Sequence, residues 1–184
     1  ERTIRELGGI GFFLGGIGPD GHIGFNVKGS DHYSTTRLTP TNYETQAAAA
    51  SDLGGIEISR SRLVITIGLQ TIIQNSDAVA IIIASGEAKA RIVFYAIQQP
   101  KDNKYPATVL QDLKNAAFYL TKGAASLLTE RRYLQIKKSN KINPIDKEQI
   151  IIDLALDKKK RLIDLSRKDF ESIRSSKEII NRGI

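Results

Sequence analysis

The sequence contains no cysteine and no methionine. Without cysteine there is no disulfide framework, no thiolate nucleophile and no zinc ribbon, and the composition gives no indication of the redox compartment. The absence of methionine and the first residue, Glu1, indicate a piece of a longer polypeptide. Alternatively, modified methionines are omitted from the sequence, which would also explain why it contains none. With 184 residues, 41% of them hydrophobic, the chain is long enough for one domain and an appendage.

Long hydrophobic runs are absent as well. The longest run, residues 78–84, is far shorter than the roughly 20 residues that a membrane-spanning helix needs. The chain does not begin with a basic segment followed by an apolar one, as a secretory signal would. We therefore predict a soluble, cytoplasmic protein that does not bind membranes.

The net charge of +7 lies entirely at one end of the chain. Residues 1–130 hold 12 Lys+Arg against 12 Asp+Glu, and residues 131–184 hold 15 against 8. This shift predicts a boundary near residue 130, followed by a basic helical extension or linker. A nucleic-acid-binding face would add clustered aromatic residues, and a membrane-surface helix would need an apolar face without aspartates, so we expect neither partner.

Apolar runs alternate with helical patterns along residues 1–130. The runs predict strands covered on both faces, and the alternation predicts an α/β layered domain with a mostly parallel sheet. Beyond the boundary, Ser166 and Asp169 have the spacing of a helix capping box. We expect strands at 10–14, 63–67, 78–84 and 117–120, and helices at 69–74, 87–98 and 107–114.

Two candidate sites follow predicted strands, where the loops and helix N-termini of a parallel sheet bind ligands. The first is the glycine-rich stretch 13–26, in which His22 could carry a proton and Asp20 could orient it. The second is Lys89, in the first turn of a helix, where an ammonium beside free N–H groups suits a phosphate or carboxylate. A hydrogen-bonded surface pair and a solvated lysine are the alternatives.

The stretch "GGIGPDGHIGFN" resembles the signature of the glucosamine-6-phosphate deaminase family. The likeness continues in the same order through "STTRLTPTNYETQ", "RLVITIGLQTI", "AIIIASGEAKA" and "YLTKGAA", over roughly residues 5–130. The resemblance implies a three-layer, Rossmann-like fold, a homo-oligomer, and conversion of glucosamine 6-phosphate to fructose 6-phosphate and ammonia without a cofactor or metal. It makes His22 the proton carrier to the ring oxygen, Asp20 its neighbour, Lys89 the phosphate ligand and Gly16 part of the sugar site.

The chain departs from the family pattern at several positions. Val27 stands where the family has a glutamate that completes the relay through the histidine, and Ser51 stands where it has a phosphate-binding arginine. Asp31 either replaces the glutamate or caps a loop, and His32 is either an exposed loop histidine or its helper in that replacement.

Three further positions bear on phosphate binding and regulation. Arg60 and Arg62 either reach the phosphate or form surface pairs. Arg37 falls at an allosteric position of the family, but Thr39 replaces the accompanying lysine, which favours a loop-bridging role for Arg37.

The family's base at C2 and its first phosphate loop have no counterpart in this sequence, so we expect these residues alone to be inactive. The resemblance predicts that residues 1–130 are the C-terminal part of a deaminase-like domain. Two alternatives stay open: a 6-phosphogluconolactonase-like hydrolase, although "IGFN" differs from that family's pattern, and a sugar-phosphate-binding domain without activity.

Overall fold

A computed structural model of the chain describes residues 1–48, 50–52 and 54–183. The chain divides into two compact units, Glu1–Ser126 and Leu127–Ile184, which are treated separately below.

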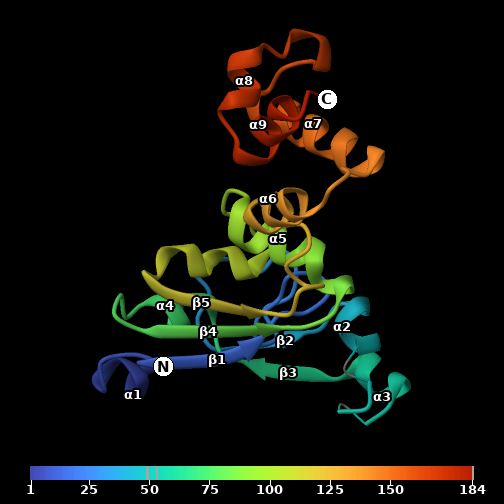
Figure 1. Cartoon of the computed structure of the whole chain (residues 1–184). Helices are drawn as coiled ribbons and strands as arrows, with labels where there is room; N and C mark the ends of the chain where they lie inside the picture. Colours follow the sequence, from blue (N-terminus) through green and yellow to red (C-terminus); the bar gives the residue numbers. More distant parts are fainter. Residues whose placement is uncertain (49, 53, 184) are drawn as a thin grey trace. The chain divides into compact units, whose positions relative to one another are not determined.

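The first unit alternates strands with helices (Figure 1). Short 3-10 helices, labelled η, interrupt or replace α-helical turns in two places. The elements are α1 Arg2–Glu6, β1 Phe12–Gly16, β2 Arg37–Pro40, α2 Tyr43–Ala48, α3 Ile56–Ser61, β3 Leu63–Thr66, α4 Leu69–Ile73, β4 Val79–Ala84, η1 Glu87–Lys89, α5 Ala90–Gln98, η2 Pro106–Asp112 and β5 Asn115–Leu120.

Three strands form a parallel sheet in the order β1-β4-β5. Phe12 pairs with Val79 and Val79 pairs with Asn115, so the three strands begin at the same level and their carboxyl ends meet at one edge. Together with the helical C-terminal unit, this sheet confirms the predicted α/β class with a mostly parallel sheet. The loops after β1 and β4, which carry the candidate site residues, therefore leave the same edge.

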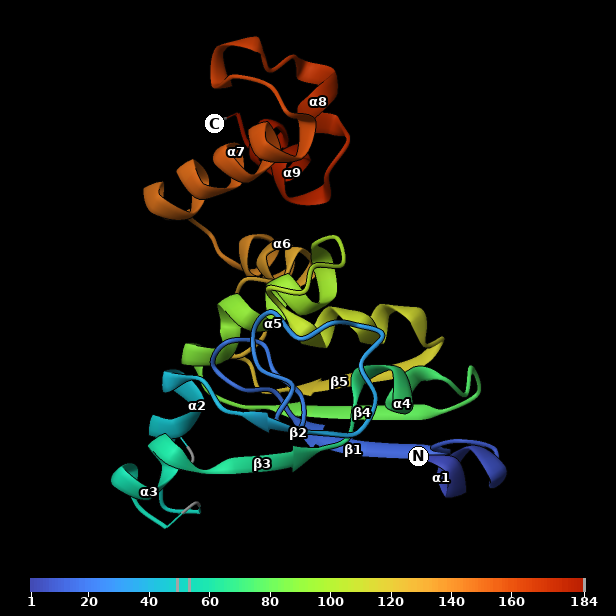
Figure 2. The same cartoon turned by 180° about the vertical axis from the view of Figure 1, so that it is seen from behind.

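One face of this sheet forms the core of the unit. Ala80 and Ile82 of β4 are fully buried, as are Val93 of α5 and Val109 of η2, and Leu110 is 1% exposed. Figures 1 and 2 both show α5 and η2 on the same side of β4 and β5. The sequence predicted an α-helix at 107–114; the structure has the 3-10 helix η2 there, whose buried residues run consecutively from Pro106 to Leu110.

The opposite face of the sheet is exposed, contrary to the expectation of strands covered on both faces. Phe12, Leu14, Ile83 and Tyr119 are each more than half exposed. They come from all three strands, and Ile83 pairs with Tyr119 across β4 and β5. Parallel sheets in globular proteins are covered on both faces, so this apolar surface is one that further polypeptide would normally cover.

The predicted strand at 63–67 is present as β3, but it does not join the parallel sheet. It pairs antiparallel with β2, with Arg37 opposite Thr66 and Pro40 opposite Leu63. Its side chains alternate between exposed and buried, because one face of this two-stranded ribbon packs inward and the other does not. An unbroken apolar run could not show this alternation in advance.

The second unit is helical, as predicted. Its elements are α6 Thr129–Lys138, α7 Pro144–Lys158, η3 Leu162–Asp164, α8 Arg167–Glu171 and α9 Arg174–Asn181. Ile136, Ile150 and Ile179 form its core, with Ile142 packed against them. The predicted capping box is confirmed: the Asp169 N–H and the Ser166 side chain, and the Ser166 N–H and the Asp169 carboxylate, form reciprocal hydrogen bonds.

Within the described part of the chain, no helix has the length and apolar character needed to cross a membrane.

Candidate active site

The glycine-rich loop after β1 folds back on itself around the His22 ring. The Gly18 N–H donates to the His22 carbonyl at 2.9 Å, and the Gly21 N–H donates to the Gly18 carbonyl at 3.1 Å. Gly21 has φ +84°, and a Cβ added at Gly18 would lie 1.9 Å from His22 Cε1. A side chain at position 18 would displace the imidazole from its present position, because the ring lies directly against the backbone there.

Asp20 and His22 form a short hydrogen bond inside this loop. His22 Nδ1 lies 2.5 Å from Asp20 Oδ1, and the two side chains are 14% and 4% exposed. The second carboxylate oxygen, Oδ2, accepts from the Lys28 backbone N–H at 2.9 Å and from Asn42 Nδ2 at 2.6 Å. Every oxygen of this buried carboxylate therefore has at least one hydrogen-bond donor.

These donors keep Asp20 ionised. Burial raises the pKa of the Asp20 carboxyl, but hydrogen bonds from His22, from the Lys28 backbone and from Asn42, together with the charge of His22, outweigh burial and hold that pKa well below its usual range. An ionised Asp20 accepts the Nδ1 proton of His22, which leaves Nε2 as the ring nitrogen that can exchange a proton with a substrate.

Lys89 reaches the same loop from the end of β4. Its Nζ donates to the Ile17 carbonyl at 2.7 Å, one residue before Gly18. Burial lowers the pKa of the Lys89 ammonium, and the negative charge of Asp20 opposes that shift. The cation and the Asp20–His22 pair thus lie around one short stretch of backbone, as a phosphate ligand and a proton carrier for one substrate would have to.

The motif segment that carries Lys89 contacts the last motif segment, "YLTKGAA". The Gly86 N–H donates to Thr121 Oγ1 at 3.1 Å, and a Cβ added at Gly123 would lie 3.0 Å from the Glu87 nitrogen. The turn after β5 therefore packs against the turn that carries Lys89.

The end of the glycine-rich loop is fixed to β3 and β2. Asn26 is fully buried; its Nδ2 donates to the Ile67 carbonyl at 2.7 Å, and its Oδ1 accepts from Arg37 at 2.8 Å. Arg37 also donates to Ser30 Oγ at 3.0 Å, which confirms the loop-bridging role predicted for it.

Gly68 gives this region a second close backbone contact. A Cβ there would lie 2.2 Å from the Ser34 carbonyl oxygen and 2.3 Å from Thr35 Cα. The Ser34 carbonyl in turn accepts from the Gln70 N–H at 2.9 Å, which joins the start of α4 to the segment leading into β2.

Comparison with known proteins finds glucosamine-6-phosphate deaminases and isomerases among the relatives of this chain. The chain is 35% identical over 127 residues to the glucosamine-6-phosphate isomerase of Candida albicans, covering 69% of this chain and 51% of that protein. It is 39% identical over 131 residues to the glucosamine-6-phosphate deaminase of Rhodopirellula baltica, covering 71% and 51%. The chain is a homologue of the glucosamine-6-phosphate deaminases. It spans about half the length of the curated relatives it matches.

A solved structure of this deaminase family has the same fold. It is described as a monomeric glucosamine-6-phosphate deaminase of the NagB superfamily, and it superposes with a TM-score of 0.62 at 31% identity over 69% of this chain and 52% of that one. No family model matches the chain. The relatives' names support the deaminase interpretation and give no support to the hydrolase alternative.

The structure shows the surroundings of the positions at which the chain departs from the family pattern. Val27 is half-buried and brings no polar atom to the pair, and Ser51 is exposed in a turn. Asp31 accepts from the Tyr33 N–H at 2.9 Å, as a loop-capping aspartate does. Arg60 pairs with Glu57 at 3.3 Å on the surface.

Gly16 and His32 differ in exposure. Gly16 ends β1 and is exposed, directly before Ile17. His32, for which an exposed loop position and a helper role beside Asp31 were both open, is half-buried, and burial, ahead of the Lys101 charge, lowers its pKa. The sequence interpretation missed Asn42 and Thr45, whose N-x-x-T spacing before a helix is the one signal that could have indicated a cap.

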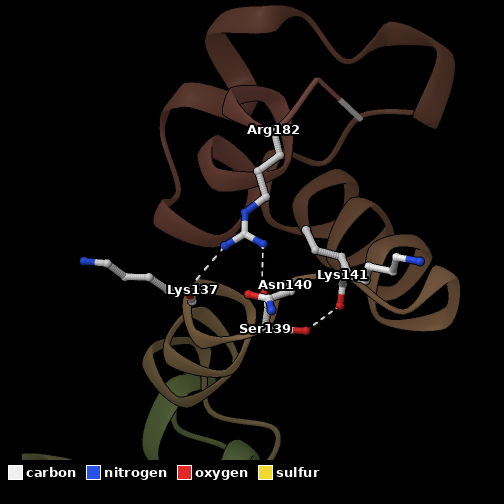
Figure 3. A pocket seen from close by; sticks show the side chains of 6 residues that line it. Lys137, Ser139, Asn140, Lys141 and Arg182 are labelled. Carbon is white, nitrogen blue, oxygen red and sulfur yellow. Dashed lines mark hydrogen bonds between the residues drawn. The ribbon is translucent and has the colours of Figure 1, made fainter.

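The C-terminal unit contains a separate open cavity of about 620 Å³ (Figure 3). It is lined by Lys137, Ser139, Asn140, Lys141, Ile142 and Arg182. The Arg182 guanidinium donates to the carbonyls of Ile136, Lys137 and Ser139 at 2.9, 3.3 and 2.7 Å. Arg182 thus satisfies the last carbonyls of α6, a structural task that accounts for the cation.

Among the described residues, no group of three or more His, Asp or Glu side chains is arranged to hold a metal ion.

Proposed function

We propose that the protein carrying this chain converts glucosamine 6-phosphate and water to fructose 6-phosphate and ammonia. The observation that carries this proposal is the Asp20–His22 pair on the loop whose Ile17 carbonyl binds Lys89. A proton carrier and a phosphate-binding cation around one backbone segment fit a sugar phosphate.

His22 acts in the ring-opening step of the proposed reaction. Its Nε2 delivers a proton to the ring oxygen while the C1–O5 bond breaks, and the anomeric hydroxyl gives up its proton as the aldehyde forms. The proton count of the sugar does not change, so one imidazole can serve both transfers. Ionised Asp20 stabilises the imidazolium form that this exchange passes through.

Lys89 binds the phosphate in this proposal, and Gly16 lines the sugar site. Lys89 already donates to a backbone carbonyl, so its ammonium has two further N–H donors for an anion. The exposed position of Gly16 at the end of β1 allows a ligand to approach the backbone there.

We infer that residues 1–130 are the C-terminal part of the deaminase-like domain and that residues 131–184 are a basic helical extension or linker. The exposed apolar face of β1, β4 and β5 supports this, because remaining polypeptide of such a domain would cover it. The C2 base then belongs to that remaining polypeptide, and these residues alone are inactive.

A homo-oligomer and a cytoplasmic location complete the proposal. The solved relative is described as monomeric, so the molar mass of the complete protein in solution, measured by light scattering, decides the first point. Cell fractionation decides the second.

A sugar-phosphate-binding domain without turnover is the second candidate, favoured by apolar Val27 and exposed Ser51. Ammonia release from glucosamine 6-phosphate by the complete protein supports the deaminase. Calorimetric binding of the same sugar without ammonia release supports the binding domain, and hydrolysis of 6-phosphogluconolactone would contradict both.

A further inference from the structure

Asn42 contacts the reactive pair from a distant part of the sequence. It lies between β2 and α2, 22 positions after Asp20, and its Nδ2 donates to Asp20 Oδ2 at 2.6 Å. This is the shortest side-chain contact that the structure gives to that oxygen. A charge-assisted hydrogen bond of this length has a strong influence on where a carboxylate points.

The orientation of the Asn42 amide is fixed by a second hydrogen bond. Its Oδ1 accepts from the Thr45 backbone N–H at 3.0 Å, the arrangement of an asparagine that caps the start of a helix. Because the oxygen must face that N–H, the NH₂ group must face Asp20. Thr45 is 1% exposed and its Oγ1 lies 3.3 Å from His22 Nδ1, so the same turn touches both members of the pair.

The contacts divide the two oxygens of Asp20 between two tasks. Oδ2 is held by Asn42 and the Lys28 N–H, and Oδ1 is left for His22. A carboxylate held at one oxygen cannot rotate the other away from the imidazole. Since Val27 offers no polar atom, Asp20 is the carboxylate that orients His22 in the described residues, and its own orientation depends on these donors.

We propose that Asn42 is a positioning residue for the Asp20–His22 pair, in addition to its role as a helix cap. The inference rests on the proposed function for its catalytic meaning, but its structural content is testable without any activity. Asn42 acts through Asp20 and makes no contact with substrate in this proposal.

Asn42→Ser separates the two roles, because serine caps helices as well as asparagine but has no N–H that reaches Asp20. In the complete protein, we expect the low-field ¹H NMR signal of the His22 Nδ1 proton to move upfield and to exchange faster with solvent. The ¹³C signal of the Asp20 carboxyl should titrate at higher pH than in the wild type. Asn42→Thr offers the same cap if the serine variant does not fold.

The matched control is Asn143→Ser. Asn143 caps α7 through an Oδ1 contact with the Ile145 N–H at 3.1 Å, and no carboxylate partner is involved. It should leave the His22 and Asp20 signals unchanged. If Asn42→Ser also leaves both signals unchanged in a folded chain, Asn42 is a cap alone and the inference is wrong.

In the complete protein, Asn42→Ser should lower kcat for ammonia release about 10- to 100-fold with little change in KM, the effect of losing one hydrogen bond to a charged group. Shifted NMR signals with no deaminase activity in the wild type would overturn the proposed function while leaving the placement of Asn42 intact. An unchanged kcat beside shifted signals would overturn the positioning role.

Discussion

The two units of the chain bury polar groups in opposite ways. The first unit buries Asp20, Asn26 and Thr45 together around one loop and gives them partners. In the described part of the second unit, the buried polar residues are Ser175 and Ser176, and the ion pairs Arg161–Asp164, Arg167–Glu171 and Arg174–Glu130 lie at the surface. Burying an ionised carboxylate is unfavourable unless it is fully hydrogen-bonded, and the first unit surrounds Asp20 with donors, whereas the core of the second unit is formed by isoleucines.

The strongest test of this contrast is His22→Ala in the complete protein. If the loop is the chemical site, ammonia release should fall roughly 10²- to 10⁴-fold, as expected for a general acid–base. His32→Ala is the matched control, because His32 is the other histidine and makes no contact with Asp20; it should change the rate less than about threefold. Equal losses in both variants would contradict the assignment.

The packing half of the contrast is tested by Leu154→Ala. Leu154 is 1% exposed in α7, and its truncation should lower the free energy of unfolding of residues 127–184 by about 2–5 kcal/mol. Hydrogen exchange of the α7 amides measures this, and the His22 Nδ1 signal should not move. Leu156→Ala, 71% exposed on the same helix, should change stability by less than about 0.5 kcal/mol; a larger effect would mean that Leu156 is covered in solution.

Acid should weaken the first unit through Asp20. The pKa of Asp20 is lower in the folded chain than its ordinary unfolded value of about 3.9. Its contribution to stability is therefore fully present above about pH 5 and is lost as pH falls below about 4. Asp20→Asn should be less stable at neutral pH and should lose less stability on acidification, measured by denaturant unfolding at pH 7 and pH 3. A parallel pH dependence in wild type and variant would exclude this linkage.

The smallest effect is expected at the end of α7. Lys159 has φ +52° and ψ +41°, a left-handed conformation that is unfavourable for any residue with a Cβ. Lys159→Gly should stabilise the second unit by up to about 1 kcal/mol. The same substitution one position earlier, Lys158→Gly, lies inside the helix and should destabilise it by about 1 kcal/mol. Relative to the wild type, the melting temperature should rise in Lys159→Gly and fall in Lys158→Gly; a fall in both variants would contradict the prediction.

Much of the fold was predictable because its strands are continuous apolar runs. The strand expected at 78–84 is β4, and the one expected at 117–120 lies within β5. β2 was missed because Arg37 and Pro40 carry no strand signal; pairing with β3 makes it a strand. The exposed sheet face could not be predicted either, since an apolar run does not tell what covers it.

The site was predictable only where its residues are close in sequence. Asp20 and His22 are two positions apart in a glycine-rich loop, and Lys89 follows a strand that ends at the same edge. Asn42, the cap of α2, follows them only after the chain has passed through β2, so its contact with Asp20 depends on tertiary structure. The local N-x-x-T pattern indicates that Asn42 caps α2, but only the tertiary fold brings Asn42 against Asp20.

Gly68 shows that intolerance to substitution does not require a functional group. Even an alanine methyl at this position would overlap the backbone of Ser34 and Thr35 and displace the strand that presents Arg37 to Asn26. In a saturation-mutagenesis library selected for growth on glucosamine as the nitrogen source, position 68 should be depleted as strongly as position 22. Gly68, which takes no part in the chemistry, would then tolerate substitution as poorly as His22, because the backbone of Ser34 and Thr35 leaves no space for a side chain.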